Sequence, residues 1–334
     1  MHTVEYPLVG ASLRERGSHD ALESLESSVV SLELGRLKAQ VPAARESIGR
    51  HRWEQIVTPP ADVVRSSQRD PRTVASRAYH KLHDMLRTCA IPPPRRSVHL
   101  CEAPGGFVQA TEDVAPADWR WMALSLGAGA VPRPAAALLA SERGRFIEAD
   151  VFDVNSCMSH LDGSADLVTA DGAIEMQHAD LEREHLPLLL AQTRLVVRAL
   201  RTGGDAIVKF FEAGQRDTLK WIAWMSRAFT SVSVIKPHGS RPTNSERYLV
   251  ARGFESEPLP LDLDQFLVAV LWLKETRDAL EDITRYQKKS LRVALDRTRE
   301  LGDVRASFSR QLGVPAQEVA SYRCPGTGAS TSGR

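Results

Sequence analysis

Between residues 97 and 254, short apolar runs typical of β-strands alternate with longer stretches typical of α-helices. The strand candidates are 97–101, 120–125, 145–149, 165–170, 205–211, 230–235 and 247–252. The helical stretches between them lie near 106–114, 133–142, 179–201 and 215–228. Strands that are almost wholly apolar, such as "DLVTA" and "DAIVKFF", predict a mostly parallel sheet with helices on both faces. The last two strand candidates lie too close for a crossover helix, so they predict an antiparallel hairpin at the sheet edge.

The segments that flank this alternation have a different pattern. The expected segments are an N-terminal, partly helical extension (1–70), an α/β domain (71–255), a helical C-terminal extension (256–322) and a disordered tail (323–334). The helix signal of the N-terminal extension lies near 20–40. A further helix is expected over about 71–90, where the prolines of "IPPP" end it.

Composition excludes some classes of protein and leaves others open. The chain is 43% hydrophobic and 25% charged, and its formal net charge of +1 gives no indication of nucleic-acid binding. Its four cysteines are far apart without a CxxC pair, which predicts free thiols rather than disulfides or a zinc site. No apolar run approaches the roughly 20 residues that span a bilayer, and the N-terminus lacks a secretory signal pattern. We therefore expect an intracellular, non-secreted protein, cytoplasmic in preference to nuclear, with no membrane association and no metal requirement.

A strand that runs into a glycine turn, "SVHLCEAPGGF" at residues 97–107, has the form of a ligand site. Glycines let the backbone turn where a β-carbon would meet a ligand, and the next helix offers its first N–H groups to an anion. The turn has neither the GxGxxG spacing of dinucleotide binders nor the GK[ST] of P-loops. Glycine pairs at strand ends are also found in plain turns, but Asp150, at the end of a later strand, adds a group able to accept from an adenine amino group. Together these features predict a nucleoside cofactor.

Four polar residues, Lys81, Asp171, Lys209 and Glu246, each lie at the edge of an apolar run. Two lysines and two carboxylates near the glycine turn predict a site that deprotonates a hydroxyl. A lysine base would need its pKa lowered from about 10.4 to roughly 7–8, which a second cation achieves by repulsion. Taken singly, Lys81, Asp171 and Glu246 have a simpler explanation as surface charges or turn residues. Lys209 does not, because it lies between "AIV" and "FF" and buried unpaired lysines are rare.

These motifs resemble the FtsJ-like family of RNA ribose 2′-O-methyltransferases over about residues 72–254. The hairpin "KPHGSRPTNSERYLVARGF" is the most specific match. "HLCEAPG", followed by the tryptophan-rich "WRWMALSLG", is similar to the cap-type (Adrift-like) members. The resemblance implies a Rossmann-like, S-adenosylmethionine-dependent methyltransferase sheet, here with helical extensions at both ends.

The resemblance also implies roles for the four polar residues. Lys209 would be the base, and Lys81 would supply the neighbouring charge and hold the target nucleotide. Asp171 would contact Lys209 and the methyl donor, and Glu246 would pair with a lysine and the ribose hydroxyl. The implied cofactor-binding residues are Glu102, Pro104, Gly105, Gly106, Phe107, Ser125, Asp150 and Asp171. The chain departs from many such enzymes at the end of the second strand, where Ser125 stands in place of an acid that binds the ribose.

RNA is the expected partner, either capped mRNA or a structured ribosomal or transfer RNA. The residues expected to contact RNA are Arg72, Arg77, Arg241, Lys288, Lys289 and Arg292. The long flanks favour a cap-type substrate, although the N-terminal region shows no pair of aromatics for a cap cage. A base or small-molecule methyltransferase would favour an NPP[YF]-like motif, which the chain lacks. A catalytically inactive RNA-binding or scaffold subunit is the alternative from another class, and the sequence predicts no oligomeric state.

Overall fold

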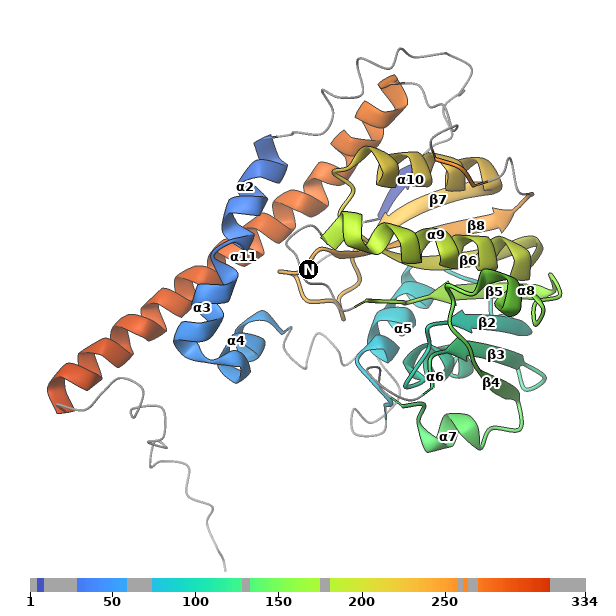
Figure 1. Ribbon diagram of the computed structural model, residues 1–334, viewed down its shortest axis with the longest axis horizontal. Helices are drawn as coiled ribbons and strands as arrows, with labels where there is room; N and C mark the ends of the chain where they lie inside the picture. The colour runs from blue at the N-terminus through green and yellow to red at the C-terminus, as the bar shows by residue number, and fades with distance from the viewer. Residues whose placement is uncertain are drawn as a thin grey trace, which may run out of the picture.

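A computed structural model describes residues 5–8, 29–58, 74–127, 133–174, 181–256, 261–263 and 270–312. Figure 1 shows a sheet flanked by helices, with a long helix and shorter ones extending to one side. Arg72, Cys324 and the expected disordered tail at 323–334 lie outside the described residues. The three described cysteines, Cys89, Cys101 and Cys157, are free thiols.

The sheet has eight strands in the order β1-β7-β8-β6-β5-β2-β3-β4. Their bounds are β1 Glu5–Leu8, β2 Arg96–Leu100, β3 Arg120–Ser125, β4 Gly144–Glu148, β5 Ala165–Ala170, β6 Leu200–Phe211, β7 Phe229–Ile235 and β8 Glu246–Phe254. Strands β2 to β6 are parallel, and β8 is antiparallel to both β6 and β7. This arrangement confirms the predicted α/β sheet and its closing hairpin.

The expectation that this hairpin forms the sheet edge is wrong. Strand β1 pairs antiparallel with β7, with Glu5 opposite Ile235, and so covers the edge. The segment "EYPL" is only four residues long, which is too short for an alternating pattern to mark it as a strand.

Alternate residues along the central strands pack on opposite faces of the sheet. Val168 and Val208 belong to the core formed with α9 and α10, whereas Leu167 and Ile207 pack with α5 and α6. The domain's helices are α5 Ala78–Thr88, α6 Gly106–Glu112, α7 Ala136–Leu139, α8 Val154–Met158, α9 Leu181–Ala199 and α10 Arg216–Ala228. Two short helices differ from expectation: α7 is shorter than the predicted 133–142, and α8 was not predicted.

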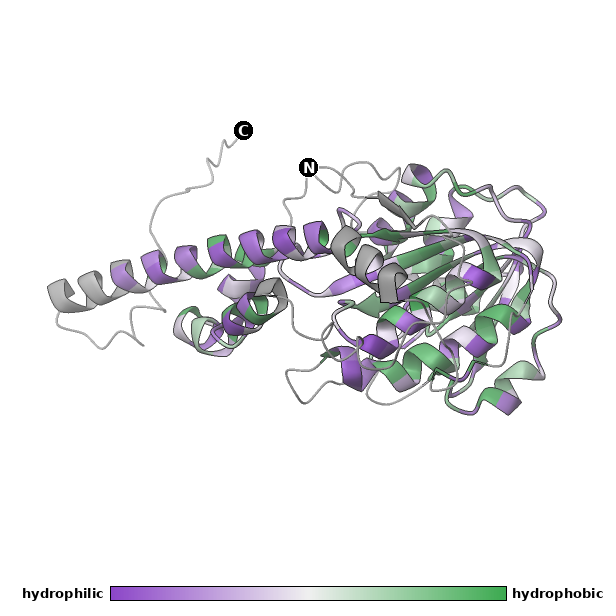
Figure 2. Cartoon of the chain, turned by 90° about the horizontal axis from the view of Figure 1, so that it is seen from above, coloured by the Kyte–Doolittle hydropathy of each residue, from purple (hydrophilic) through white to green (hydrophobic). Residues whose placement is uncertain are grey.

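The extensions are helical, as the sequence predicts. Their helices are α2 Val29–Lys38, α3 Val41–Ile48, α4 Arg50–Val57 and α11 Val270–Leu312. Buried residues of α2 to α4, including Leu34 and Trp53, form one cluster with Leu291 and Leu295 of α11. Polar residues predominate along the coloured part of α11 outside this cluster (Figure 2). Among the described helices, none combines the length and the hydropathy that crossing a membrane requires.

Candidate active site

The ends of neighbouring strands bring together three of the four predicted catalytic residues. β5 and β6 are parallel, with Ala170 opposite Val208, so Asp171 emerges beside Lys209. Glu246 begins β8, the antiparallel neighbour of β6. The fourth residue, Lys81, comes from α5, which packs over this part of the sheet.

The four side chains form two ion pairs. Lys81 Nζ lies 2.8 Å from Glu246 Oε2, and Lys209 Nζ lies 2.9 Å from Asp171 Oδ1. Lys209 also donates to the backbone carbonyl of Asp171 at 2.7 Å. All four side chains are largely removed from solvent, so these pairs are screened far less than surface pairs.

Tyr248 joins the two pairs, and sequence analysis did not select it as a site residue. Its hydroxyl donates to Asp171 Oδ1 at 2.8 Å, and Lys81 Nζ lies 3.4 Å from its oxygen. Burial, together with the Asp171 and Glu246 carboxylates, raises the pKa of Tyr248 well above its ordinary value, so the hydroxyl remains a donor. A signal was available: Tyr248 is two residues after Glu246, and therefore on the same face of the strand.

Opposite charges in the site stabilise one another. Burial tends to raise the pKa of Glu246, but Lys81, Lys209 and Lys236 outweigh it and lower that pKa to about 2. Burial tends to lower the pKa of Lys81, but Asp171 and Glu246 outweigh it and raise that pKa. The repulsion that was expected between the two lysines is therefore opposed by a carboxylate beside each of them. Glu246 Oε1 is buried and has no hydrogen-bond partner among the described residues, which leaves one acceptor open within the site.

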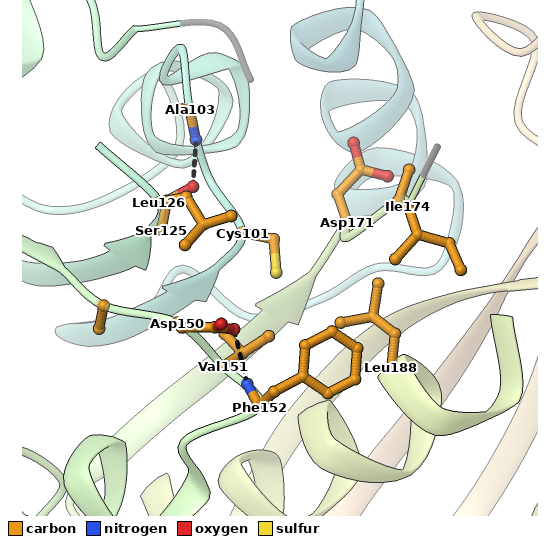
Figure 3. A pocket seen from close by; sticks show the side chains of 12 residues that line it. Cys101, Ala103, Ser125, Leu126, Asp150, Val151, Phe152, Asp171, Ile174 and Leu188 are labelled. Atoms are coloured by element: carbon orange, nitrogen blue, oxygen red, sulfur yellow. Dashed lines mark hydrogen bonds between the residues drawn. The ribbon is translucent and has the colours of Figure 1, made fainter. Parts of the chain in front are cut away.

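A cavity of about 300 Å³ adjoins this network (Figure 3). It is lined by Cys101, Ala103, Ser125, Leu126, Ala149, Asp150, Val151, Phe152, Asp171, Ala173, Ile174 and Leu188. Asp150 accepts from the Phe152 N–H through Oδ1 at 2.9 Å. Burial raises the pKa of Cys101, which lies between Asp150 and Asp171, to about 12, so it remains a thiol. Sequence analysis found the polar residues of this cavity and missed its apolar walls.

The glycine turn packs against α5 and borders a second cavity. A β-carbon on Gly106 would lie 2.5 Å from Ser76 Oγ and 2.8 Å from Tyr79 N, so this glycine permits the chain that enters α5 to pack against α6. Gly105 has a φ of 121° and, with Pro104, borders a separate cavity of about 250 Å³. Neither glycine lines the 300 Å³ cavity.

Glu102 and Phe107 also make contacts that stabilise the turn. Glu102 Oε1 accepts from the N–H groups of Phe107 and Val108 at 2.7 and 3.0 Å, so both amides have an acceptor within the turn. The Phe107 ring packs beside Tyr248, with 6.3 Å between ring centroids. Of the eight residues predicted to bind cofactor, Ser125, Asp150 and Asp171 line the 300 Å³ cavity.

Glu102→Gln should change how stability depends on pH. Burial raises the pKa of Glu102 from 4.5 to about 8, although its two amide partners oppose this. A carboxyl whose pKa is raised by folding stabilises the protein below its unfolded pKa, and this contribution is lost as pH rises towards the folded pKa. Thermal unfolding should therefore show wild type losing stability relative to Glu102→Gln between about pH 4.5 and 8. Parallel curves for the two proteins would contradict a buried, protonated Glu102.

The residues expected to contact RNA lie in two places. Arg77 is exposed and donates to the Gly239 carbonyl at 3.2 Å, and Arg241 Nε is buried without a partner among the described atoms. On α11, Lys288 and Arg292 both pair with Glu33 of α2, whereas Lys289 is exposed. The pairing gives Lys288 and Arg292 a role in holding α2 against α11.

Comparison with known proteins gives consistent matches. The model of the FtsJ-like methyltransferase family matches residues 74–254. The chain is 35% identical over 106 residues to a cap-specific mRNA (nucleoside-2'-O-)-methyltransferase of Autographa californica nuclear polyhedrosis virus, covering 30% of this chain and 40% of the relative. It is 27% identical over 275 residues to cap-specific mRNA (nucleoside-2'-O-)-methyltransferase 2 of Danio rerio, covering 72% of this chain and 36% of the relative.

A third relative has a different substrate in its name. The chain is 28% identical over 236 residues to ribosomal RNA large subunit methyltransferase E of Rhodopseudomonas palustris, covering 69% of this chain and 95% of the relative. The chain thus spans less than half the length of either cap-specific relative and nearly the whole of the ribosomal one.

Proposed function

Because the chain belongs to the FtsJ-like methyltransferase family, we propose that it transfers a methyl group from S-adenosylmethionine to a ribose 2′-hydroxyl of RNA. One observation carries this proposal: the ion pairs Lys81–Glu246 and Lys209–Asp171 are joined by Tyr248 next to a cavity of nucleoside size. Asp171 belongs to both the ion-pair network and the cavity lining.

The cavity suits an adenosine group. Its volume of about 300 Å³ is at the lower end of the range of about 300–1,000 Å³ for small-molecule pockets, and its lining is mostly apolar with a few polar groups. Asp150 and Ser125 would hold the polar edge of the nucleoside, and Phe152, Ile174 and Leu188 would contact its apolar faces. When bound, S-adenosylmethionine supplies an electrophilic methyl group carried on a sulfonium.

The side chains around the cavity supply the rest of the chemistry. Lys209, in its neutral form, removes the proton of the 2′-hydroxyl, and Glu246 Oε1 accepts a hydrogen bond from the target ribose. Tyr248 and Lys81 fix the carboxylates of Asp171 and Glu246. Since these groups interact strongly, the ionisation that governs the rate belongs to the set rather than to one lysine.

Cap-proximal nucleotides of mRNA are the substrate that we propose first, and ribosomal or transfer RNA the second. The names of the viral and zebrafish relatives support the first, and the coverage of the ribosomal relative supports the second. The test is incubation with labelled S-adenosylmethionine and matched capped, uncapped and ribosomal RNAs, followed by nuclease mapping of the label. Transfer that requires the cap supports the first substrate, and transfer to ribosomal RNA alone supports the second.

An inactive scaffold is separable from an enzyme by one binding measurement. Isothermal titration should detect S-adenosylmethionine binding by the purified chain. Absence of binding and of methyl transfer to every RNA would favour the scaffold alternative.

Asp150→Ala should weaken S-adenosylmethionine binding by about ten- to a hundredfold, because a hydrogen bond to a charged group contributes about 1.5–3 kcal/mol. Asp153→Ala is the matched control: Asp153 is three residues away and caps α8 through the Ser156 N–H, outside the cavity lining. Isothermal titration of both variants measures the difference. Equal affinities would remove Asp150 from the cofactor site.

A further inference from the structure

Helix α11 binds the residues on both sides of Glu246, although it lies outside the segment that matches the family model. Gln287 Nε2 donates to Ser245 Oγ at 3.2 Å and to the Thr243 carbonyl at 3.3 Å. Arg247 Nη2 donates to Thr284 Oγ1 at 2.8 Å. Thr284 and Gln287 are three residues apart, so one face of α11 makes all of these contacts.

The direction of the side chains explains how α11 reaches this segment without entering the active site. Side chains alternate across a β-strand, so those of Ser245 and Arg247 point away from the face on which Glu246 meets Lys81. α11 therefore supports the start of β8 from behind. Gln287, Ser245 and Arg247 are each 2% exposed or less, so these polar groups have little access to water that could replace a lost partner.

A second helix of the extensions binds the same place. Ser245 Oγ donates to Glu212 Oε1 at 2.6 Å, and the Glu212 N–H donates to the Ser245 carbonyl at 3.1 Å. Lys38 of α2 forms an ion pair with Glu212. The hydrogen bonds run from Gln287 through Ser245 to Glu212, so α2 and α11 together hold the residue that precedes Glu246.

The opposite side of the segment is held by the methyltransferase domain itself. Lys236 Nζ donates to the Glu246 carbonyl at 2.7 Å and to the Asn244 carbonyl at 2.9 Å. The His238 N–H donates to Asp84 Oδ2 of α5 at 2.8 Å. The segment around Glu246 is thus held by hydrogen bonds from its own domain on one side and from the extensions on the other.

We propose that Gln287 and Thr284 are positioning residues, through which α11 holds Glu246 at the correct distance from Lys81 and the target ribose. This inference rests on the proposed function, since it assigns the C-terminal extension to the reaction itself. The extension then acts at the active site in addition to any contact with RNA. A displacement of about 1 Å at a reacting group can cost about a hundredfold in rate, so loss of this support should be measurable.

The test compares Gln287→Ala with Val293→Ala, an exposed residue six positions along the same helix. We expect kcat to fall about tenfold or more in Gln287→Ala, with the KM for S-adenosylmethionine unchanged, and to stay at the wild-type value in Val293→Ala. Thr284→Val, which keeps the side-chain shape and removes the acceptor of Arg247, should lower kcat in the same direction. Thr284→Val also provides the test if the Gln287→Ala variant does not fold.

A double-mutant cycle separates positioning from general destabilisation. If Gln287 acts through Glu246, Gln287→Ala should add little to the residual rate of Glu246→Gln. An equal fold-loss in both backgrounds, or wild-type kcat in both Gln287→Ala and Thr284→Val, would overturn the inference.

Hydrogen exchange keeps this inference distinct from the proposed function. Gln287→Ala should speed exchange of the amides in residues 243–247 and leave those of β5 unchanged. Methyl transfer absent from wild type, with faster exchange in the variant, would refute the proposed function alone. Unchanged exchange would refute the positioning role.

Discussion

Lys209→Ala should lower the rate of methyl transfer by about 10²- to 10⁴-fold, the usual contribution of a general base, while S-adenosylmethionine and RNA still bind. The reason is that Lys209 acts on the 2′-proton in the transition state rather than on either ligand in the ground state. Single-turnover rates and the two dissociation constants measure these effects separately. A large loss of affinity for either ligand would instead assign Lys209 to binding.

Lys209→Arg is the matched variant, because it retains the positive charge. It should be nearly as inactive as the alanine variant, since arginine does not lose its proton at a workable pH. The wild-type rate should rise through one ionisation on the alkaline side of neutral that reports the coupled site. Near-full activity of Lys209→Arg would contradict proton abstraction and favour an electrostatic role for this residue.

Glu246→Ala should have the second large effect, and it should act on both activity and stability. The variant leaves the buried Lys81 ammonium without its 2.8 Å partner, which typically costs about 3–5 kcal/mol of unfolding free energy. Methyl transfer should fall to near background, since the ribose also loses its acceptor. Replacing both members of the pair, as in Lys81→Met with Glu246→Leu, should recover part of the stability and none of the activity.

The pH dependence of unfolding provides the control for this prediction. The pKa of Glu246 is lowered from 4.5 to about 2, so its contribution to stability is present above pH 4.5 and is lost as pH falls towards about 2. The stability difference between wild type and Glu246→Ala should shrink over that interval. A difference that stays constant with pH would show that the lost stability is not due to the carboxylate charge.

The sheet and the closeness of Asp171 to Lys209 could be predicted from the sequence because both depend on local patterns. Apolar runs mark the strands, and Asp171 and Lys209 each directly follow such a run. Because neighbouring parallel strands end at the same edge of the sheet, those two residues must lie close together. Lys81 and Glu246 were found by their resemblance to a family motif, not by a pattern of spacing.

What the sequence did not predict depends on contacts between distant segments. At Gly106, for example, the neighbour that excludes a β-carbon is the chain leading into α5, some 30 residues earlier. The helix signal of α11 was visible, whereas its hold on Ser245 exists only after the helix packs behind β8. The apolar cavity walls, such as Phe152, resemble any exposed hydrophobic residue until the strands are assembled.

The most direct test of the central claim is the position of the transferred methyl group on RNA. An RNA methylated by the purified chain with labelled S-adenosylmethionine would be digested to nucleosides and separated. We predict that the label is found in a 2′-O-methylated nucleoside, and that a single 2′-deoxy substitution at the mapped nucleotide abolishes transfer. Label on a base, or undiminished transfer to the 2′-deoxy RNA, would contradict 2′-O-methylation by this chain.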